Sequence, residues 1–217
     1  IAPNPGLKIT GEQIDSIHTL YPYRIPTTHG MNFLSKYPAT LLFDTVYSES
    51  SAIAIYQVKI EGHTVTVVNQ HMESIGLTQT DKELYHEITA HPNTDRLDEI
   101  KKHLLSKLMN AAEIRNRQAD LTAEKIQNIP GNIIVCGDFN DTPMSYVYRT
   151  MAKGLNDAFS QCGSGYSHTF RGFFNTLRID YVLSSEGFDA LSYEVPTVDY
   201  SDHHPVVVRL RKNAMNN

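Results

Sequence analysis

The sequence predicts an α/β fold in which a mixed or antiparallel sheet system is flanked by helices. Three observations carry this prediction: several short β-branched, apolar stretches follow one another, turn residues separate them, and one long stretch repeats apolar residues every three or four positions. The helices are too few to alternate strictly with the strands, so a doubly wound parallel sheet is not favoured. At 217 residues, the chain is expected to form one domain.

In the first half, residues 11–20 carry apolar side chains at near-helical spacing and predict a short helix, which Tyr21-Pro22-Tyr23 ends. Residues 39–46 and 51–60 are rich in apolar and β-branched residues and predict strands. Glu61-Gly62-His63 then predicts the turn of a hairpin whose second strand covers residues 64–70.

In the second half, residues 94–129 predict a long amphipathic helix with a candidate break near Asp120. A strand that includes Val135 follows, and then a short helix at residues 145–151. Strands dominate the remainder and are predicted at residues 168–171, 179–184, 191–198 and 205–211.

The composition is that of an ordinary globular protein, with 41% hydrophobic and 20% charged residues, and no apolar stretch approaches the ~20 residues of a membrane span. The net charge of -5 predicts no strong basic surface for nucleic acid, so any affinity for phosphate must be local. Cys136 in an apolar strand and Cys162 in a Gly/Ser loop do not suggest a disulfide framework. We expect a monomer.

The first residue is Ile1 rather than Met, and the opening six residues are neither a charged signal region nor a folded element. We therefore expect an upstream segment to have been removed, with any targeting or membrane signal that it held. The remaining sequence does not indicate a localisation.

Polar clusters accompany three of the predicted strands. One strand runs into Asp138 and Asn140, a second contains Asp180, and the dipeptide Asp202-His203 precedes the last strand. Strand ends fix short polar side chains at a sheet rim, where the ligands of α/β proteins usually gather. Taken singly, each cluster is weak, because the first is also typical of an Asx turn and the last of a loop before an edge strand.

If these clusters converge with His71, they supply three carboxylates, one carboxamide and two imidazoles. This set suits metal-assisted phosphoryl hydrolysis, because Mg²⁺ takes carboxylate and water oxygens and histidines supply protonation steps near neutral pH. The sequence has no clustered Cys pair, His-Glu-x-x-His helix, Walker loop or Gly-x-Ser-x-Gly elbow. Zinc, nucleotide-binding and acyl-transfer chemistries are therefore unsupported.

Four segments together resemble the endonuclease/exonuclease/phosphatase superfamily, whose members are deoxyribonuclease I-like. They occur in the family's order, within a match from residue 31 to residue 210, and read Asn69-Gln70-His71-Met72-Glu73-Ser74, Gly137-Asp138-Phe139-Asn140, Arg178-Ile179-Asp180-Tyr181 and Ser201-Asp202-His203. The resemblance implies a four-layer sandwich of two packed mixed β-sheets flanked by helices. It also implies a phosphoesterase that uses Mg²⁺, with Mn²⁺ as the alternative ion.

By this resemblance, Asp138 and Asn140 orient and activate the attacking water or stabilise the transition state. His203 acts as a base or contacts the phosphate, and Asp180 orients its ring, as a supporting carboxylate does elsewhere. His71 contacts the scissile phosphate or protonates the leaving oxygen, and the alternative for His71 is a solvated loop histidine.

The resemblance makes Asp202 the metal ligand. Arg171 and Arg178 are candidate substrate-binding residues, because a guanidinium group binds phosphate in a bidentate manner. For Arg178, a strand-edge salt bridge is an equal alternative. The family pattern opens with an Asn-bearing strand and a strand ending in a Gln-Glu pair, and neither is found in the chain. We therefore expect the single domain, residues 1–217, to lack its first strands and this chain alone to bind Mg²⁺ poorly.

The predicted function is hydrolysis of a phosphodiester or phosphomonoester by in-line attack of water. The substrate classes left open are a small molecule, a lipid headgroup and a nucleic acid, although the negative net charge disfavours duplex DNA. The alternative is a non-catalytic binding or scaffold domain that retains the fold, because a fold does not determine a function.

Overall fold

A six-stranded mixed sheet forms the centre of the computed structural model, which describes residues 10–27, 30–78, 80–81, 83–84, 90, 97–172 and 175–213. The strand order is β3-β4-β5-β6-β8-β7, in which β5 and β6 are parallel and the other neighbours are antiparallel. The bounds of these strands are Ala39–Ser48 (β3), Ser51–Ile60 (β4), His63–His71 (β5), Asn132–Asp138 (β6), Asn156–Asp157 (β7) and Asp180–Ser184 (β8).

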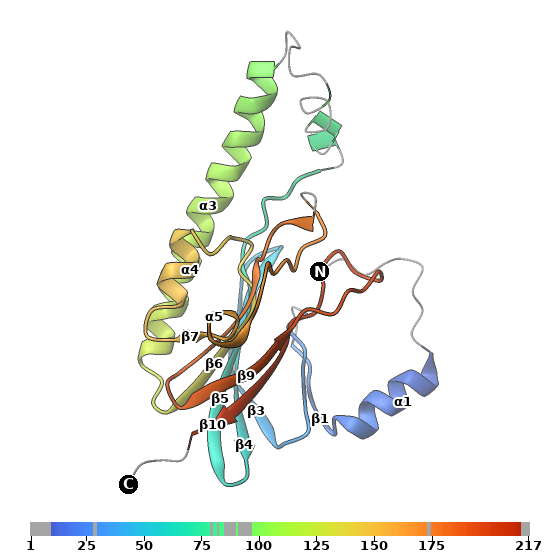
Figure 1. The fold of residues 1–217 in the computed structure, drawn as a ribbon, viewed down its shortest axis with the longest axis vertical. Coiled ribbons are helices and arrows are strands. Elements are labelled where there is room, and N and C mark those ends of the chain that lie inside the picture. Colours follow the sequence, from blue (N-terminus) through green and yellow to red (C-terminus); the bar gives the residue numbers. More distant parts are fainter. Residues whose placement is uncertain are drawn as a thin grey trace.

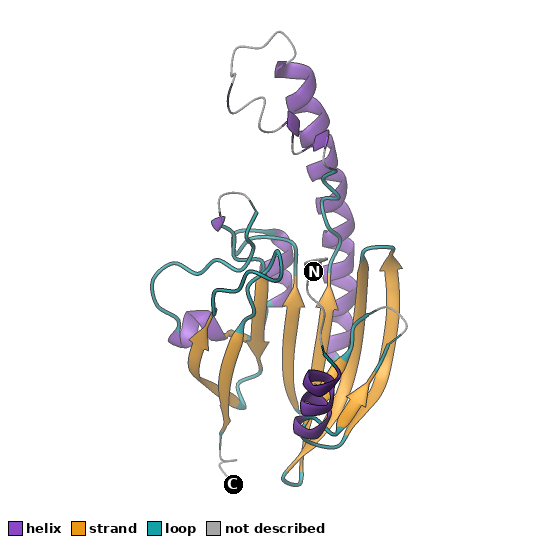
Figure 2. Ribbon diagram, turned by 90° about the vertical axis from the view of Figure 1, so that its right-hand side faces the viewer, coloured by secondary structure: helices purple, strands orange, loops and turns teal. Residues whose placement is uncertain are grey.

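Helix α3 (Leu97–Gln127) lies in the connection between the two parallel strands. A parallel pair cannot be closed by a tight turn, so the chain crosses one face of the sheet before β6 begins. Helix α4 (Tyr146–Met151) packs against α3 on that face, while α1 (Gly11–Leu20) lies on the opposite side of the sheet (Figures 1 and 2). The crossover places the ends of β5 and β6 at the same edge of the sheet.

The main core lies between the six-stranded sheet and the helices α3 and α4. Val68, Val135 and Leu183 come from neighbouring strands, pair across the sheet in register and are fully buried. Ala119 of α3 and Val147 of α4 join the same buried cluster. Side chains alternate between the two faces along β5, β6 and β8, so the intervening residues are half-buried on the other face. A polar residue ends β5 (His71) and β6 (Asp138) and begins β8 (Asp180).

Two smaller antiparallel pairs accompany the central sheet. β1 (Tyr23–Ile25) pairs with β2 (Phe33–Ser35), and β9 (Phe188–Glu194) pairs with β10 (Val207–Lys212). The short helix α5 (Ala158–Cys162) contacts β9. These elements confirm the predicted α/β fold of mixed sheet and flanking helices, and the described residues form two two-stranded sheets beside the six-stranded one. None of the helices in the described ranges has the length and apolarity needed to cross a membrane.

Two predicted features are not found in the structure, and the strand predicted at residues 191–198 is shifted to Phe188–Glu194. The candidate break at Asp120 is wrong, because α3 continues through this residue, whose exposed carboxylate accepts a hydrogen bond from Tyr146. The predicted strand at residues 168–171 is also wrong, since only isolated bridges form there, at Phe170. Its neighbour Thr169 uses its hydroxyl to accept the backbone N–H groups of residues 179 and 180, which replaces regular strand pairing.

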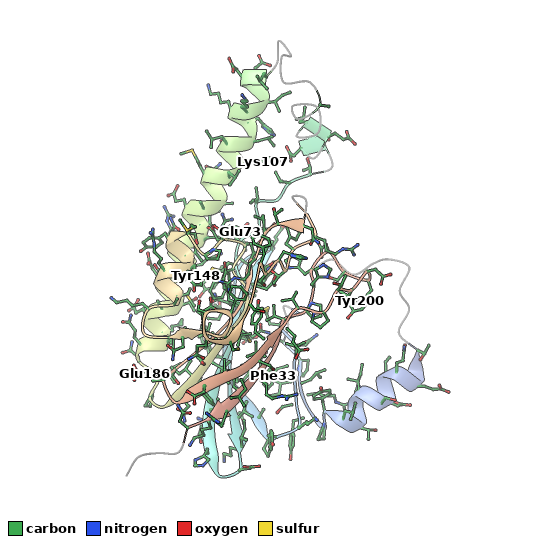
Figure 3. The ribbon with its side chains drawn as sticks, viewed as in Figure 1. Phe33, Glu73, Lys107, Tyr148, Glu186 and Tyr200 are labelled. Carbon is green, nitrogen blue, oxygen red and sulfur yellow. The ribbon has the colours of Figure 1, made fainter. Side chains whose placement is uncertain are left out.

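The N-terminal half of α3 extends beyond the edge of the sheet (Figures 1 and 2). The buried carboxylate of Asp81 ties the preceding segment to it, with His103 Nε2 at 2.8 Å and Lys107 Nζ at 2.5 Å. Figure 3 places Lys107 on this half of the helix. The hydrogen bond from Lys107, together with those from Thr78 and His103, holds the pKa of Asp81 well below its usual range, so the carboxylate stays charged.

Gly137 allows β5 and β6 to approach each other at the end of the sheet. Its φ of 141° lies outside the range that side-chain-bearing residues normally adopt, and a Cβ atom there would lie 1.8 Å from the backbone oxygen of Gln70. Gln70 is its partner in the parallel ladder. The residue before Asp138 therefore has to be a glycine for the strands to keep this register.

We expect Gly137→Ala to lower the free energy of unfolding by about 3 kcal/mol or more, because it adds overpacking to an unfavourable backbone conformation. Urea unfolding monitored by circular dichroism measures the loss. Gly11→Ala is the control, since nothing lies within 4 Å of a Cβ atom added at Gly11. Equal stability of the two variants would contradict the steric argument.

Candidate active site

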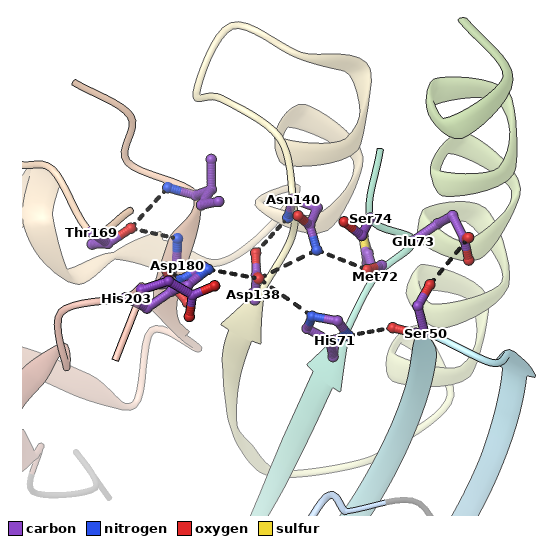
Figure 4. Close-up of polar contacts among 12 residues, drawn as sticks. Ser50, His71, Met72, Glu73, Ser74, Asp138, Asn140, Thr169, Asp180 and His203 are labelled. Atoms are coloured by element: carbon purple, nitrogen blue, oxygen red, sulfur yellow. Dashed lines mark hydrogen bonds and ion pairs between the residues drawn. The ribbon is translucent and has the colours of Figure 1, made fainter. Parts of the chain in front are cut away.

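His71, Asp138 and Asp180 form a row across three neighbouring strands. His71 pairs with Asp138 in the parallel ladder, and Asp138 pairs with Asp180 in the antiparallel ladder. Side chains at paired positions share one face of a sheet. Because β5 and β6 end at this edge and β8 begins there, the three side chains meet at one rim (Figure 4).

Asp138 is buried and lies at the centre of this row. The backbone N–H of Asn140 donates to Asp138 Oδ1 at 2.7 Å, which is the Asx turn that the sequence offered as an alternative. Asn140 adopts a φ of 51°, a conformation that asparagine tolerates, and its amide Nδ2 donates to the carbonyl of Met72 at 2.9 Å and lies 3.3 Å from Asp138 Oδ2. The turn fixes Oδ1 and directs Oδ2 towards the remaining groups of the site.

His203 reaches Asp138 from the loop before β10. Its ring atom Nδ1 lies 2.8 Å from Asp180 Oδ2, and its Nε2 lies 3.7 Å from Asp138 Oδ2. Thr169 holds the start of β8 by accepting the backbone N–H of Asp180 at 3.1 Å, and the Phe170 ring lies 5.0 Å from the imidazole. The buried ring of His203 is therefore fixed at its edge and its face.

His71 has a matching arrangement on the other side. Its Nδ1 contacts the backbone carbonyl of Ser50, and its Nε2 lies 3.5 Å from Asp138 Oδ2. A carbonyl oxygen can only accept, so Nδ1 carries the proton and Nε2 is the atom available to the site. Two imidazoles thus present Nε2 to one carboxylate oxygen, one held by a neutral carbonyl and the other by a carboxylate.

The buried charges shift two pKa values at this rim. Burial raises the pKa of Asp180, and the charge of Asp138 adds to this effect against the hydrogen bond from His203. Burial by itself lowers the pKa of His203, but the hydrogen bond to Asp180 and the charges of Asp180, Asp138 and Asp202 together raise it above its ordinary value. The site therefore favours the protonated His203 ring, whose Nε2–H can donate.

The carboxylates of this group fit a hard divalent cation. Among the described residues, Asp138, Asp180 and His203 bring ligand atoms within 4.8 Å of one another. Asp138 and Asp180 are negatively charged neighbours with little solvent to screen them, which a cation would relieve. Mg²⁺ and Mn²⁺ prefer carboxylate oxygens and bind through one or two of them together with substrate and water, so these two residues would hold the ion.

A comparison with protein families agrees with this geometry. The model of the endonuclease/exonuclease/phosphatase family matches residues 9–203, which is most of the chain. The chain belongs to this family. Enzymes of the endonuclease/exonuclease/phosphatase family are hydrolytic phosphoesterases and nucleases and generally depend on a divalent metal.

Solved structures of low sequence identity share the fold of this family member. An endonuclease/exonuclease/phosphatase family protein from Bacteroides thetaiotaomicron is 19% identical, with a TM-score of 0.61 over 94% of this chain and 81% of that one. A mannosyl-6-phosphatase from the same organism is 18% identical, with a TM-score of 0.57 over 92% and 81%. Beta toxin from Staphylococcus aureus is 15% identical, with a TM-score of 0.56 over 91% and 81%. No curated protein matches the chain.

The ligand role predicted for Asp202 in this family member stays a prediction. Its side chain is exposed and lies outside the group of ligand atoms found among the described residues. Its backbone oxygen accepts the N–H of Arg171 at 2.9 Å, which helps to turn the next residue, His203, towards Asp180. The carboxylates that are grouped with His203 in the described part of the chain are those of Asp138 and Asp180.

The two predicted arginines occupy different environments. Arg178 is buried, donates to Asp157 Oδ2 at 2.9 Å and lies 4.7 Å from the rings of Phe159 and Tyr181. It precedes β8, so strand alternation does not place it beside Asp180, and the salt-bridge alternative describes it correctly. Arg171 is exposed and donates to the carbonyl of Ser201 at 2.9 Å, so it remains a candidate for substrate contact.

We expect the stabilising effect of His203 to depend on pH. Its folded pKa lies above the unfolded value of about 6.5, so its contribution to stability is fully present below that value and is lost as the pH rises through the folded pKa. The difference in unfolding free energy between the wild type and His203→Gln should therefore shrink as the pH rises from about 6.5 through the folded pKa. Urea titrations in a metal chelator measure it, and a difference that grows over this interval would contradict the assigned shift.

Proposed function

We propose that the protein hydrolyses a phosphodiester or phosphomonoester by in-line attack of water, with the help of a divalent cation. The observation that supports this most is the pair of imidazole Nε2 atoms, of His71 and His203, that flank Asp138 Oδ2 at 3.5 and 3.7 Å. Groups that give and take protons meet there beside carboxylates that fit a cation.

Asp138 orients the attacking water in this proposal. Its Oδ1 is occupied by the N–H of Asn140, so Oδ2 is the oxygen that accepts a hydrogen bond and then a proton from the water. The carboxamide of Asn140, held on the carbonyl of Met72, keeps the loop after β6 in place. The phosphoryl group lies between this water and the two imidazoles.

The two histidines act on opposite oxygens of the phosphoryl group. His203 keeps Nδ1 on Asp180 and uses Nε2–H to stabilise negative charge that develops on a non-bridging oxygen. His71 keeps Nδ1–H on the carbonyl of Ser50 and, in its doubly protonated form, gives the proton on Nε2 to the leaving oxygen. A bound Mg²⁺ or Mn²⁺ at Asp138 and Asp180 would neutralise charge on the phosphoryl group.

The substrate is proposed to be a small phosphoester or a lipid headgroup rather than duplex DNA, and the protein to act as a monomer. The net charge of -5 gives no general attraction for a polyanion. One structural neighbour is named a mannosyl-6-phosphatase, which is an example of the phosphomonoester class on this fold. Turnover of plasmid DNA should be slower than turnover of small phosphoesters or phospholipid vesicles.

A non-catalytic binding domain is the weaker alternative. Binding alone does not require two imidazoles with fixed Nδ1 atoms and a shared carboxylate oxygen between their Nε2 atoms. Burial of Asp138, Asp180 and His203 at one rim also carries an electrostatic cost that hydrolysis would explain.

We expect Asp138→Ala and His203→Ala each to lower kcat by about 10²- to 10⁴-fold, because each removes a group that acts on a proton or a charge in the transition state. The assay uses the full-length protein on a panel of phosphodiesters and phosphomonoesters with Mg²⁺. Chelation of the metal should abolish turnover, and Mg²⁺ or Mn²⁺ should restore it.

His63→Ala and Asp189→Ala are matched controls. His63 is exposed at the start of β5, at the far end of the strand from His71, and Asp189 is half-buried and paired with Arg211. Both variants should keep wild-type turnover. If the wild type and the Asp138 and His203 variants share one background rate across the panel, the protein is not this enzyme.

A further inference from the structure

The β3–β4 turn, residues 49–50, supplies the carbonyl that holds His71. The carbonyl belongs to Ser50, so the orientation of the His71 ring depends on the path of this turn. Glycine and proline are absent from the turn, and β3 has register shifts near it. Its position is therefore fixed by side-chain contacts more than by the preferences of its own backbone.

Glu73 makes those contacts. Its carboxylate accepts hydrogen bonds from three serine hydroxyls of the turn and its flanks: Ser50 at 3.2 Å, Ser51 at 3.0 Å and Ser48. The Ser48 and Ser51 hydroxyls also contact each other at 2.8 Å. One ionised group thus gathers both strands of the hairpin, and hydrogen bonds to a charged acceptor are the stronger kind. Figure 4 shows Ser50 between Glu73 and His71.

Side chains of α3 hold the backbone of Glu73 in place through hydrogen bonds. The buried Gln118 accepts the backbone N–H of Glu73 at 2.9 Å and donates to Ser51 at 2.8 Å. The buried Arg115 donates to the backbone oxygen of Glu73 at 3.1 Å, and its Nε lies 3.2 Å from Asp141, which follows Asn140. Figure 3 places Glu73 where α3 passes the edge of the sheet. The carboxylate is therefore a fixed point against which the turn is positioned.

We propose that Glu73 is a positioning residue for His71, acting through the β3–β4 turn. By fixing Ser50, the carboxylate keeps the carbonyl on Nδ1 of His71, which in turn keeps Nε2 directed at Asp138 Oδ2. Glu73 does not touch the reacting atoms in this arrangement. The inference rests on the proposed function for its effect on turnover, but its effect on the His71 ring is independent of any activity.

The direct test reads the His71 ring without substrate. Two-bond nitrogen–proton NMR spectra distinguish a ring protonated at Nδ1 from one protonated at Nε2. The wild type should show the Nδ1–H form, Glu73→Ala should lose it in part or in full, and Glu73→Gln should keep most of it, because an amide can still bond the serine hydroxyls. Ser48→Ala removes one donor and should reduce the Nδ1–H form of His71, as Glu73→Ala does. It is the variant to use if Glu73→Ala disturbs folding.

The kinetic test is a double-mutant cycle with His71→Ala. Glu73→Ala should lower kcat by about tenfold, less than the roughly 10²-fold that a 1 Å misplacement of a reacting group can cost. The same change should have little further effect when His71 is already alanine. Glu49→Ala is the matched control, since Glu49 is an exposed carboxylate in the same turn, and it should change neither the ring nor the rate.

The outcomes separate this inference from the proposed function. An unchanged Nδ1–H form in Glu73→Ala, or a loss of kcat that is the same with and without His71, would overturn the positioning role. A protein without phosphoesterase activity, whose His71 ring still responds to Glu73→Ala, would overturn the proposed function and leave the positioning role supported.

Discussion

The parallel pairing of β5 with β6 is the constraint on which the rest of the site depends. It brings two strand ends to one edge, and α3 can connect them only by crossing a face of the sheet. Because side chains alternate, a slip of one residue would turn His71 away from Asp138 and move it into the core. Gly137 permits this register, since only a residue without a Cβ atom fits against Gln70 there.

The site uses Asp138 as a common reference for groups from separate parts of the chain. The backbone of Asn140 fixes one of its oxygens, and the Asn140 amide, His71 and His203 approach the other. Each imidazole is oriented from behind, by Ser50 or by Asp180, so its position is set by elements that do not face the substrate. Buried partners on α3 extend this support, which links helix packing to the geometry of proton transfer.

The sequence was sufficient for the main helices and strands, because their periodicity is local and strong: α1 and β4 begin and end where the pattern predicts. It also identified the residues of the rim through the motifs around Asp138, Asp180 and His203. The resemblance assigned Asp180 to the ring of His203, where the structure has it, but it did not predict that the Asp202 side chain is exposed, since that depends on loop direction. Arg178 differs for a similar reason, because its partner Asp157 lies 21 positions away.

The support of His71 by a main-chain oxygen has a consequence for how the sequence of this site could change in evolution. Every amino acid supplies the same carbonyl, so a change of residue 50 keeps the atom that the ring uses but removes the hydroxyl that Glu73 binds. An alignment column at position 50 would then report on the hydroxyl and not on the carbonyl, although the ring contacts the carbonyl. An amide-to-ester analogue of the bond between residues 50 and 51 would reveal a dependence on this carbonyl that ordinary substitution scanning cannot detect.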